Sequence, residues 1–416
     1  MNRQSFIIGI LMLIPLLSAS LFAAEIYTVN SESRTLSRID SETGALNNVF
    51  TPLGLTPNLM YVDEQHIFVV CSGDNAIQMI NRANGTHIRY IPVAASSNPW
   101  DVVKAGDFLY VTGLFTNKVY KISLQSYFVV NQITVGNAPE GLRVYDGKLF
   151  VANTGGYQNN YAGSSVSVID LASFTVLETI PVWTNPQYLV AHNGFIHVSC
   201  TGNWFDVSGK VDIIDAATLQ NVHRIDIGGN PGSLWIGPYA KAYLGDGMST
   251  GLYSYDAVNY NVYNNANNPL NPSAYAVDGN DQFIALLTQT WGSNSMVKLR
   301  HHDLSHLAEY TVGLVATDMK VWGGNVSNDD PLVPVLKTSL YPNPVRQNGL
   351  LYLDSPAKTV VSVVFYNLKG QKVHEMSIPA GEKQISLSGM KLSAGVYIYR
   401  LSSGNAVQSG KIAVMK

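Results

Sequence analysis

A short, mostly apolar segment with the character of an extended strand recurs seven times along this chain, with a period of about 41 residues. The first copy reads Ile26-Tyr27-Thr28-Val29-Asn30, and its β-branched and aromatic residues predict a β-strand. One repeat of this length cannot bury its apolar face alone, so the copies are expected to stack in an open array or a closed ring. The seven copies begin at Ile26, Ile67, Leu109, Leu149, Ile196, Ala242 and Phe283.

Each repeat contains further strand patterns. A second segment follows, as in Leu36 to Asp40, and leads into a polar turn and a third, outward strand. Asp40, Asp170, Asp215 and Asp256 recur at the strand ends, which predicts that they cap turns. Four antiparallel strands per repeat are typical of a propeller blade. The loop that leads to the last strand carries Pro57, Pro99, Pro139, Pro186, Pro231 or Pro272, and the seventh copy has Ala316 instead.

The strand count also predicts how the ring closes. The mature chain begins on a second strand at Ile26, whereas Ala316 to Trp322 reads as an unpaired first strand. This last strand is expected to complete the blade begun by residues 26–53, which removes exposed sheet edges. The fold class predicted for residues 25–323 is therefore all-β, a seven-bladed β-propeller.

The repeat resembles the YVTN or YncE-like family of seven-bladed propellers. Leu109-Tyr110-Val111-Thr112, Val166 to Asp170 and Ile133 to Pro139 carry the resemblance, which spans roughly residues 25–323. It implies the propeller fold. It implies no particular activity, because that family is functionally diverse.

The propeller pattern stops after Trp322. Residues 324–338, rich in Gly, Asn, Asp and Pro, read as a linker, and residues 339–416 as a small β-sandwich of about seven strands. The last segment resembles a type A C-terminal sorting domain of the type IX secretion system, with Asn367 where that family often has Asp. The resemblance implies that residues 339–416 engage the type IX secretion machinery and are usually removed afterwards. It rests on Tyr341-Pro342-Asn343-Pro344, Val363 to Gly370, Leu392 to Tyr397 and the basic end at Lys416.

The N-terminus reads as a secretory signal peptide over residues 1–24. Arg3 precedes an apolar run from Phe6 to Leu17, and small residues follow. That run is short for a membrane span, so an uncleaved anchor is the weaker interpretation, and no transmembrane segment is expected in the mature chain. The predicted location is secreted or attached to the outer surface, after export to the periplasm.

The net charge limits the classes of ligand to expect, and the cysteine positions limit the disulfides. The net charge is −3, of which residues 335–416 contribute +7 (ten basic, three acidic) and the remainder −10 (16 basic, 26 acidic). An acidic propeller is a poor partner for phosphate backbones, so nucleic acid is not expected as a ligand. Cys71 and Cys200 occupy equivalent places in repeats two and five, which are not neighbours in a ring of seven, so buried free thiols are expected.

Insertions indicate a binding face. The spacing between the second and third strands is ten residues in four repeats but 17, 15 and 13 in the fourth, fifth and seventh. These loops lie on one face of a propeller, and insertions on one face mark a binding surface. Rings beside amides and hydroxyls suit a glycan or a corrinoid, and a protein ligand also remains open. The candidate ligand-binding residues are Phe115, Trp100, Trp183, Tyr157, Asn160, Tyr161, Asn203, Trp204, Phe205, Asp206 and Trp291.

Catalytic patterns are weak. His301, His302 and His306 cluster near Asp303 at an outer turn, but a metal needs further ligands in correct geometry. We therefore name no catalytic residue, metal or cofactor. The prediction is a non-catalytic, exported, ligand-binding propeller. A lyase or hydrolase acting at the central channel and a structural adhesion module are the alternatives, and the ligand and oligomeric state stay open.

Overall fold

The computed structural model describes residues 24–323 and, further on, residues 338–341, 345, 349–353, 360–367, 371–388, 390, 392–403 and 406–415. Apart from Ala24 and Thr338, the predicted signal peptide and linker lie outside the described residues. No helix in the described part of the chain is long and apolar enough to cross a membrane.

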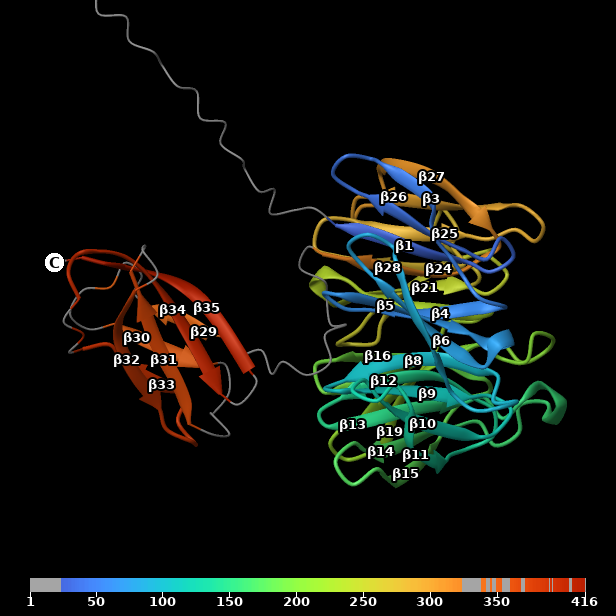
Figure 1. The fold of residues 1–416 in the computed structure, drawn as a ribbon, viewed down its shortest axis with the longest axis horizontal. Helices are drawn as coiled ribbons and strands as arrows, with labels where there is room; N and C mark the ends of the chain where they lie inside the picture. Colours follow the sequence, from blue (N-terminus) through green and yellow to red (C-terminus); the bar gives the residue numbers. More distant parts are fainter. Residues whose placement is uncertain are drawn as a thin grey trace, which may run out of the picture. The chain divides into compact units, whose positions relative to one another are not determined.

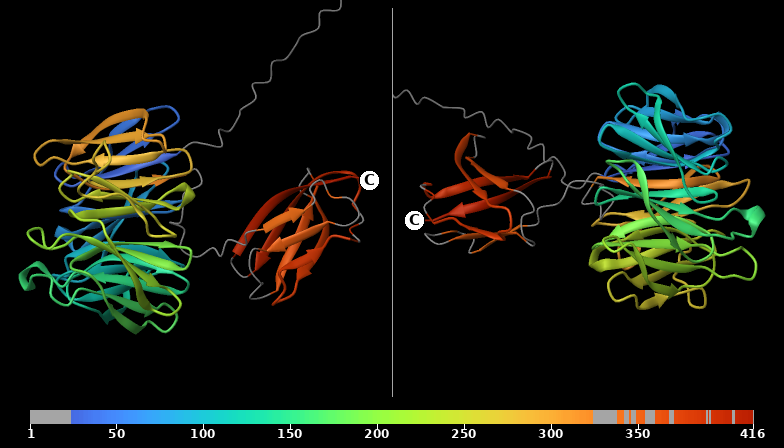
Figure 2. Two further views of the ribbon diagram at one scale, coloured as in Figure 1. Left: turned by 180° about the vertical axis from the view of Figure 1, so that it is seen from behind. Right: turned by 90° about the horizontal axis from the view of Figure 1, so that it is seen from below.

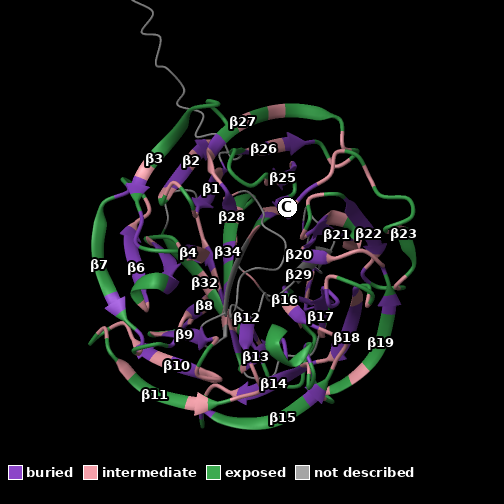
Figure 3. Cartoon of the chain, turned by 90° about the vertical axis from the view of Figure 1, so that its right-hand side faces the viewer, coloured by how far each residue is buried: buried purple, intermediate pink, exposed green. Residues whose placement is uncertain are grey.

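Residues 24–323 form seven four-stranded antiparallel sheets arranged around an axis, which confirms the predicted fold class (Figure 1). Figure 3 views this ring along its axis, with β3, β7, β11, β15, β19, β23 and β27 at the rim and β28, β4, β8, β12, β16 and β20 nearer the centre.

Each blade is given from its innermost to its outermost strand. Blade 1 is β28 (Ala316–Trp322), β1 (Glu25–Asn30), β2 (Thr35–Asp40) and β3 (Leu46–Pro52); blade 2 is β4 (Pro57–Val62), β5 (His66–Cys71), β6 (Ala76–Asn81) and β7 (His87–Pro92). Blade 3 is β8 (Pro99–Ala105), β9 (Phe108–Gly113), β10 (Lys118–Ser123) and β11 (Val129–Thr134); blade 4 is β12 (Pro139–Tyr145), β13 (Lys148–Asn153), β14 (Ser165–Asp170) and β15 (Thr175–Pro181). Blade 5 is β16 (Pro186–His192), β17 (Phe195–Cys200), β18 (Lys210–Asp215) and β19 (Gln220–Asp226); blade 6 is β20 (Pro231–Ile236), β21 (Lys241–Asp246), β22 (Leu252–Asp256) and β23 (Val262–Asn264); blade 7 is β24 (Ala276–Gly279), β25 (Ile284–Thr288), β26 (Asn294–Arg300) and β27 (His306–Leu314).

Burial follows the position of a strand within its blade. In β5 every residue after His66 is buried, because each blade is covered on both faces by its neighbours. The outermost strands are largely exposed, as in β15. The core therefore lies between blades. One such cluster joins blades 7 and 1 through Ile26, Ile39, Leu299 and Met319.

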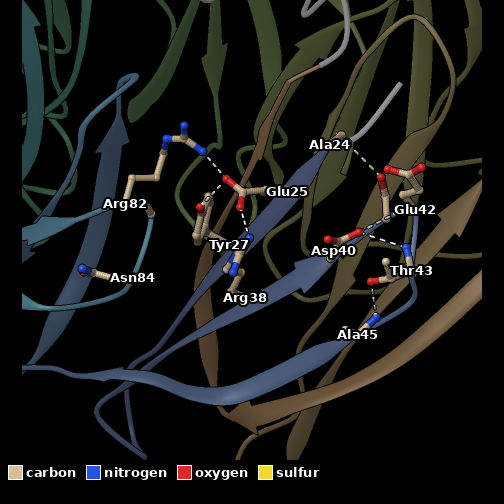
Figure 4. A network of polar contacts seen from close by, with 12 residues as sticks. Ala24, Glu25, Tyr27, Arg38, Asp40, Glu42, Thr43, Ala45, Arg82 and Asn84 are labelled. Atoms are coloured by element: carbon tan, nitrogen blue, oxygen red, sulfur yellow. Dashed lines mark hydrogen bonds and ion pairs between the residues drawn. The ribbon is translucent and has the colours of Figure 1, made fainter. Parts of the chain in front are cut away.

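Ring closure occurs as the strand count predicts. β28 pairs with β1 in antiparallel register, with Ile26 opposite Val321 and Thr28 opposite Met319. Glu25, the first residue of β1, accepts a hydrogen bond from the Tyr27 hydroxyl at 2.7 Å and forms ion pairs with Arg38 and Arg82 (Figure 4). The Arg82 guanidinium also lies 5.1 Å from the centre of the Trp322 ring, so this network joins the first and last strands to blade 2.

Polar side chains of the inner strands link neighbouring blades. The Asp101 carboxylate in blade 3 accepts the Leu142 N–H of blade 4 at 2.8 Å, and the equivalent Asp318 in blade 1 accepts the Met60 N–H of blade 2 at 2.8 Å. The Thr112 hydroxyl donates to the Glu140 carbonyl at 2.8 Å. Because the inner strands are held by such bonds, the side chains around the axis are fixed in position.

The outer turns are capped as predicted. Asp40 accepts the N–H groups of Glu42 and Thr43, and Asp170, Asp215 and Asp256 accept equivalent bonds in their blades. These bonds hold the pKa of each carboxyl below its ordinary value. Three short 3₁₀ turns complete the propeller: η1 (Ser72–Asp74), η2 (Tyr157–Asn159) and η3 (Pro238–Ala240). Cys71 and Cys200 are buried free thiols, as the repeat positions predict.

The C-terminal strands form two sheets of a separate β-domain. One sheet contains Val363, Phe365 and Leu401, which pack with Leu351 of the other sheet in a single apolar cluster. The first sheet has the order β32 (Lys372–Ile378), β31 (Val361–Tyr366), β34 (Gly395–Ser403) and β35 (Ala406–Val414), and the second has β29 (Thr338–Tyr341), β30 (Leu350–Leu353) and β33 (Gln384–Ser386). Figure 2 shows the strands of this domain in orange and red.

Candidate functional site

The loops between the second and third strands of each blade lie at one end of the ring, together with the loops that enter the next blade. We call this end the loop-bearing face. Its longest loops between second and third strands are residues 154–164 in blade 4 and 201–209 in blade 5, and the loop of residues 265–275 that enters blade 7 is as long as the first of these. In blade 7, part of the predicted insertion belongs to a strand. β26 begins at Asn294, which pairs with Leu314, so the loop contains only residues 289–293.

The blade 4 loop is held by a buried tyrosine. The Tyr161 ring is buried and contacts the exposed Tyr157 ring edge-on, with 6.1 Å between centroids. Gly155 has a φ of +87°, and a Cβ there would lie 2.5 Å from the Tyr161 carbonyl, so only glycine fits. Asn160 is exposed and takes a left-handed conformation that ends η2. Tyr161 thus anchors the loop, and Tyr157 points outward.

The blade 5 loop is organised around Asn203. Its buried side-chain oxygen accepts three backbone N–H groups, from Phe205 and Asp206 at 3.1 Å and Val207 at 2.9 Å. Its amide donates to the Asp206 carboxylate at 2.8 Å. The hydrogen bonds of Asn203 are therefore used within the loop, and they hold Phe205 outward.

Trp204 packs between blades. Its ring lies against the backbone of Gly247 in the blade 6 loop, so close that a Cβ at Gly247 would come within 2.6 Å of it. Trp204 also interacts with the Tyr161 side chain of blade 4 and partly offsets the rise in pKa that burial causes there. Trp204 is only half-buried, but its contacts with blades 4 and 6 connect three blades.

Trp183 and Trp100 are also partly buried. The Trp183 indole N–H donates to the Ser208 carbonyl at 2.9 Å, and Lys210 and Arg224 lie 4.5 and 4.9 Å from its ring centre. Such contacts between cations and a ring fix the side chain in place. Trp100 is the second residue of β8, at the end of an innermost strand.

The remaining aromatic candidates are strongly exposed. Phe115, Tyr157, Phe205 and Trp291 expose 72%, 67%, 80% and 82% of their surface. They come from four blades of the loop-bearing face. The structure joins Tyr157, Tyr161 and Trp204 in one group and Asn203 with Asp206 in another, whereas Phe115, Trp100, Trp183 and Trp291 make no ring or hydrogen-bond contact with either group among the described contacts. Sequence reasoning missed Leu55 and Met248, which are exposed on the same face.

The opposite face also carries exposed rings. Tyr239 lies on η3, between the first and second strands of blade 6, and Phe128 lies in the outer turn of blade 3. The turn residues there gave no signal for an aromatic site. These two residues provide matched controls for the rings of the loop-bearing face.

Ionisable groups converge at the axis, and sequence reasoning missed them. Burial raises the pKa of Glu140 to about 8 and that of Asp101 to about 7, the latter against the hydrogen bond from Leu142. The Tyr188 and Tyr275 side chains interact with each other, and burial raises both pKa values, with Glu140 and Asp318 adding to the shift. Asp101, Glu140, Tyr188 and Asp318 stand one or two places after the start of an inner strand, and Tyr275 directly precedes one, so aligning the recurring prolines could have found most of them.

The histidine cluster holds no metal-binding arrangement. Among the described residues, no group of three His, Cys, Asp or Glu side chains is placed to hold a metal ion. The His302 ring stacks on Trp235 with 6.2 Å between centroids. His197 bonds the Tyr255 hydroxyl at 2.7 Å in the core, and burial lowers its pKa to about 3.

Comparisons with known proteins give a different result for each of the two domains. Residues 339–415 match the family model of the secretion system C-terminal sorting domain, which marks the chain as a secreted or outer-surface protein and its C-terminus as the part that addresses the type IX machinery. No curated protein matches the chain.

Solved structures resemble the propeller. A streptogramin B lyase structure is 16% identical with a TM-score of 0.51, covering 63% of this chain and 86% of its own. Selenomethionine-substituted virginiamycin B lyase from Staphylococcus aureus is 12% identical with a TM-score of 0.50, covering 63% and 87%. The dihydro-heme d1 dehydrogenase NirN in complex with DHE is 11% identical with a TM-score of 0.53, covering 74% and 77%. At these identities the likeness concerns the fold alone.

Proposed function

We propose that this exported propeller, of the YVTN or YncE-like kind, binds a ligand on its loop-bearing face without catalysing a reaction. The observation that carries the proposal is the set of exposed rings of Phe115, Tyr157, Phe205 and Trp291 on one end of the ring. Singly exposed rings are common on proteins, as Tyr239 and Phe128 on the opposite face illustrate, whereas several rings carried by the loops of one face favour an interaction site.

The loops that carry these rings are ordered before any ligand binds. Asn203 fixes the backbone beneath Phe205, and Tyr161 fixes the loop beneath Tyr157. A pre-ordered ring loses little conformational entropy on binding, and each aromatic side chain can bury about 150–250 Å². Rigid loops on a β scaffold are a common site of recognition.

The chemistry of the face favours a glycan. Aromatic rings stack on the apolar faces of sugars, and the neighbouring Gln158, Asn159 and Asn160 are exposed and can bond hydroxyl groups. A corrinoid or a protein partner offers similar surfaces, and these are the alternatives that the experiment distinguishes. The sorting domain serves export, and the proposed site consists of propeller residues alone.

The test compares two double variants of the mature chain. Phe205→Ala with Trp291→Ala removes two exposed rings of the loop-bearing face, and Phe128→Ala with Tyr239→Ala removes two exposed rings of the opposite face. A glycan array, a corrinoid titration and a protein pull-down identify the ligand class. We expect the first pair to abolish binding, the second pair to preserve it, and the melting temperature of both to match the parent. Equal binding by the two pairs would refute the proposal.

A further inference from the structure

We propose that the axis beneath the loop-bearing face binds a primary ammonium group, with the Glu140 carboxylate as its counter-ion. This subsite involves none of the exposed loop rings. It extends the proposed function, and rests on it only in that a ligand would enter from the same face.

Glu140 lies on the inner strand of blade 4. It is the second residue of β12, directly after Pro139, at the end of the inner strand that adjoins the loop-bearing face. Its charge acts on Tyr161 of the blade 4 loop and on Tyr188 and Tyr275, which come from the inner regions of blades 5 and 7. Blades 5 and 7 are not neighbours in the ring, so a carboxyl within electrostatic reach of both tyrosines lies near the axis, just beneath the loops.

One carboxylate oxygen of Glu140 has no hydrogen-bond partner among the described residues. Only 8% of the residue is exposed, and its Oε2 atom is buried without a hydrogen bond. Buried polar atoms are normally paired, so an unpaired carboxylate oxygen requires an explanation. The nearby acids differ in this respect: Asp101 accepts the N–H groups of Val102 and Leu142, and Asp318 accepts those of Met60 and Met319.

Three acidic side chains and one lysine interact near the axis. Asp101, Glu140 and Asp318 all act on Tyr188, and the cation that acts on Asp101 and Asp318 is Lys320, 3.6 Å from Asp318. Burial raises the pKa of all three acids, so a cation placed beside them favours their ionised forms. The described residues offer no group of three acidic, His or Cys side chains placed for a metal, so an organic cation fits better.

Two tyrosine rings and the Glu140 oxygen indicate which kind of cation fits. Tyr188 and Tyr275 are half-buried and retain accessible surface although they lie among the inner strands. Their ring faces attract a positive charge. The free Glu140 oxygen accepts a hydrogen bond, which a primary ammonium can donate and a quaternary ammonium cannot. The site therefore fits an amino group at the end of a ligand, as on an amino sugar or a lysine side chain.

The experiment uses two probes that differ only in this group. The mature chain is titrated by calorimetry at about pH 8 with n-butylammonium and with 1-butanol, which has the same carbon chain but no charge. We expect saturable binding of n-butylammonium, and binding of 1-butanol that is weaker by about tenfold or more. The absence of n-butylammonium binding, or equal binding of both probes, would overturn the proposal.

Variants then test the residue. Glu140→Gln keeps the size of the side chain and removes its charge, and it should weaken n-butylammonium binding by about tenfold or more. Glu178→Gln makes the same charge change on the exposed outer strand β15 of the same blade and should bind like the parent. Unchanged binding by Glu140→Gln contradicts the proposal, and retained folding of each variant is checked by its melting curve.

The two proposals fail separately. The Phe205→Ala and Trp291→Ala double variant should still bind n-butylammonium as the parent does. Loss of n-butylammonium binding in that variant would contradict an axial site that is independent of the loop rings. Loss of glycan binding alone concerns only the loop-bearing face.

Discussion

The Asp318 carboxylate accepts a hydrogen bond from the backbone N–H of Met60 at 2.8 Å, although 258 residues separate them in sequence. The bond joins the last strand of the propeller to the first strand of blade 2. Asp101 and Leu142 repeat the same arrangement between blades 3 and 4. Inner strands of neighbouring blades are thus connected directly by side chains, in addition to the apolar contacts between the sheets.

Replacing Asp318 with Ala should destabilise the propeller. The change leaves the buried Met60 N–H without its acceptor, which costs about 1–3 kcal/mol of unfolding free energy. Urea unfolding followed by fluorescence measures the loss. Asp226→Ala, at an exposed carboxylate paired with Lys210, is the control and should change stability by less than about 1 kcal/mol. Equal effects of the two substitutions would mean that the link across the closure contributes nothing.

The raised pKa of Glu140 predicts a pH-dependent stability. The pKa of this carboxyl is about 8 in the folded chain against an ordinary 4.5, so between these values the folded protein holds a proton that the unfolded chain has lost. Stability should therefore fall as pH rises from about 4.5 to about 8.

Glu140→Gln should remove that part of the decline. The variant should match the parent near pH 4.5 and exceed it near pH 8, as measured by chemical unfolding across this range. The groups that face Glu140 are Tyr161, Tyr188 and Tyr275, and they stay uncharged in this range because burial raises their pKa values. Asp101, with a pKa of about 7, contributes a similar slope in both proteins. A parent and variant with parallel pH profiles would contradict the assignment.

The two neighbouring rings of the blade 5 loop should behave differently. Trp204→Ala removes a half-buried ring that packs on the backbone of Gly247 and interacts with Tyr161, so we expect a loss of about 1–2 kcal/mol in unfolding free energy. Phe205→Ala removes an exposed ring and should leave stability unchanged within about 0.5 kcal/mol. The reverse order in thermal unfolding would show that Phe205 supports the fold and Trp204 does not.

Asn203→Ala should loosen the loop of residues 201–209. Three backbone N–H groups lose their shared acceptor, so amide hydrogen exchange in this segment should speed up while the strands of blade 5 stay protected. Asp206→Ala, which removes only the partner of the Asn203 amide, should have a smaller effect. Exchange that is unchanged in Asn203→Ala would mean that the loop is ordered by other contacts.

The fold was accessible from the sequence because propeller strands carry periodic, local signals. The segment from Ile26 to Asn30 and its six equivalents recur at a regular spacing, and the unpaired last strand from Ala316 to Trp322 required a partner at the chain start. Turn capping by Asp40 and its equivalents followed from a repeated local motif. The repeat and the caps are local patterns, and the closing pair follows from counting the strands.

The site was harder to predict, because its residues are defined by three-dimensional packing. Nothing in the sequence distinguishes the exposed Phe205 from the adjacent Trp204, whose ring is held by Gly247 and Tyr161. Asn203 resembled a ligand-orienting amide, yet its bonds serve its own loop. Glu140 has a buried, unbonded oxygen and a raised pKa only because the inner strands of other blades enclose it.

Hydroxyl-radical footprinting of the mature chain, with and without the ligand that the binding screen identifies, tests the central claim most directly. The account predicts that the ligand protects Phe115, Tyr157, Phe205 and Trp291 from oxidation and leaves Phe128 and Tyr239 on the opposite face unprotected. Protection of Tyr239 and Phe128, with the rings of the loop-bearing face oxidised as before, would contradict it.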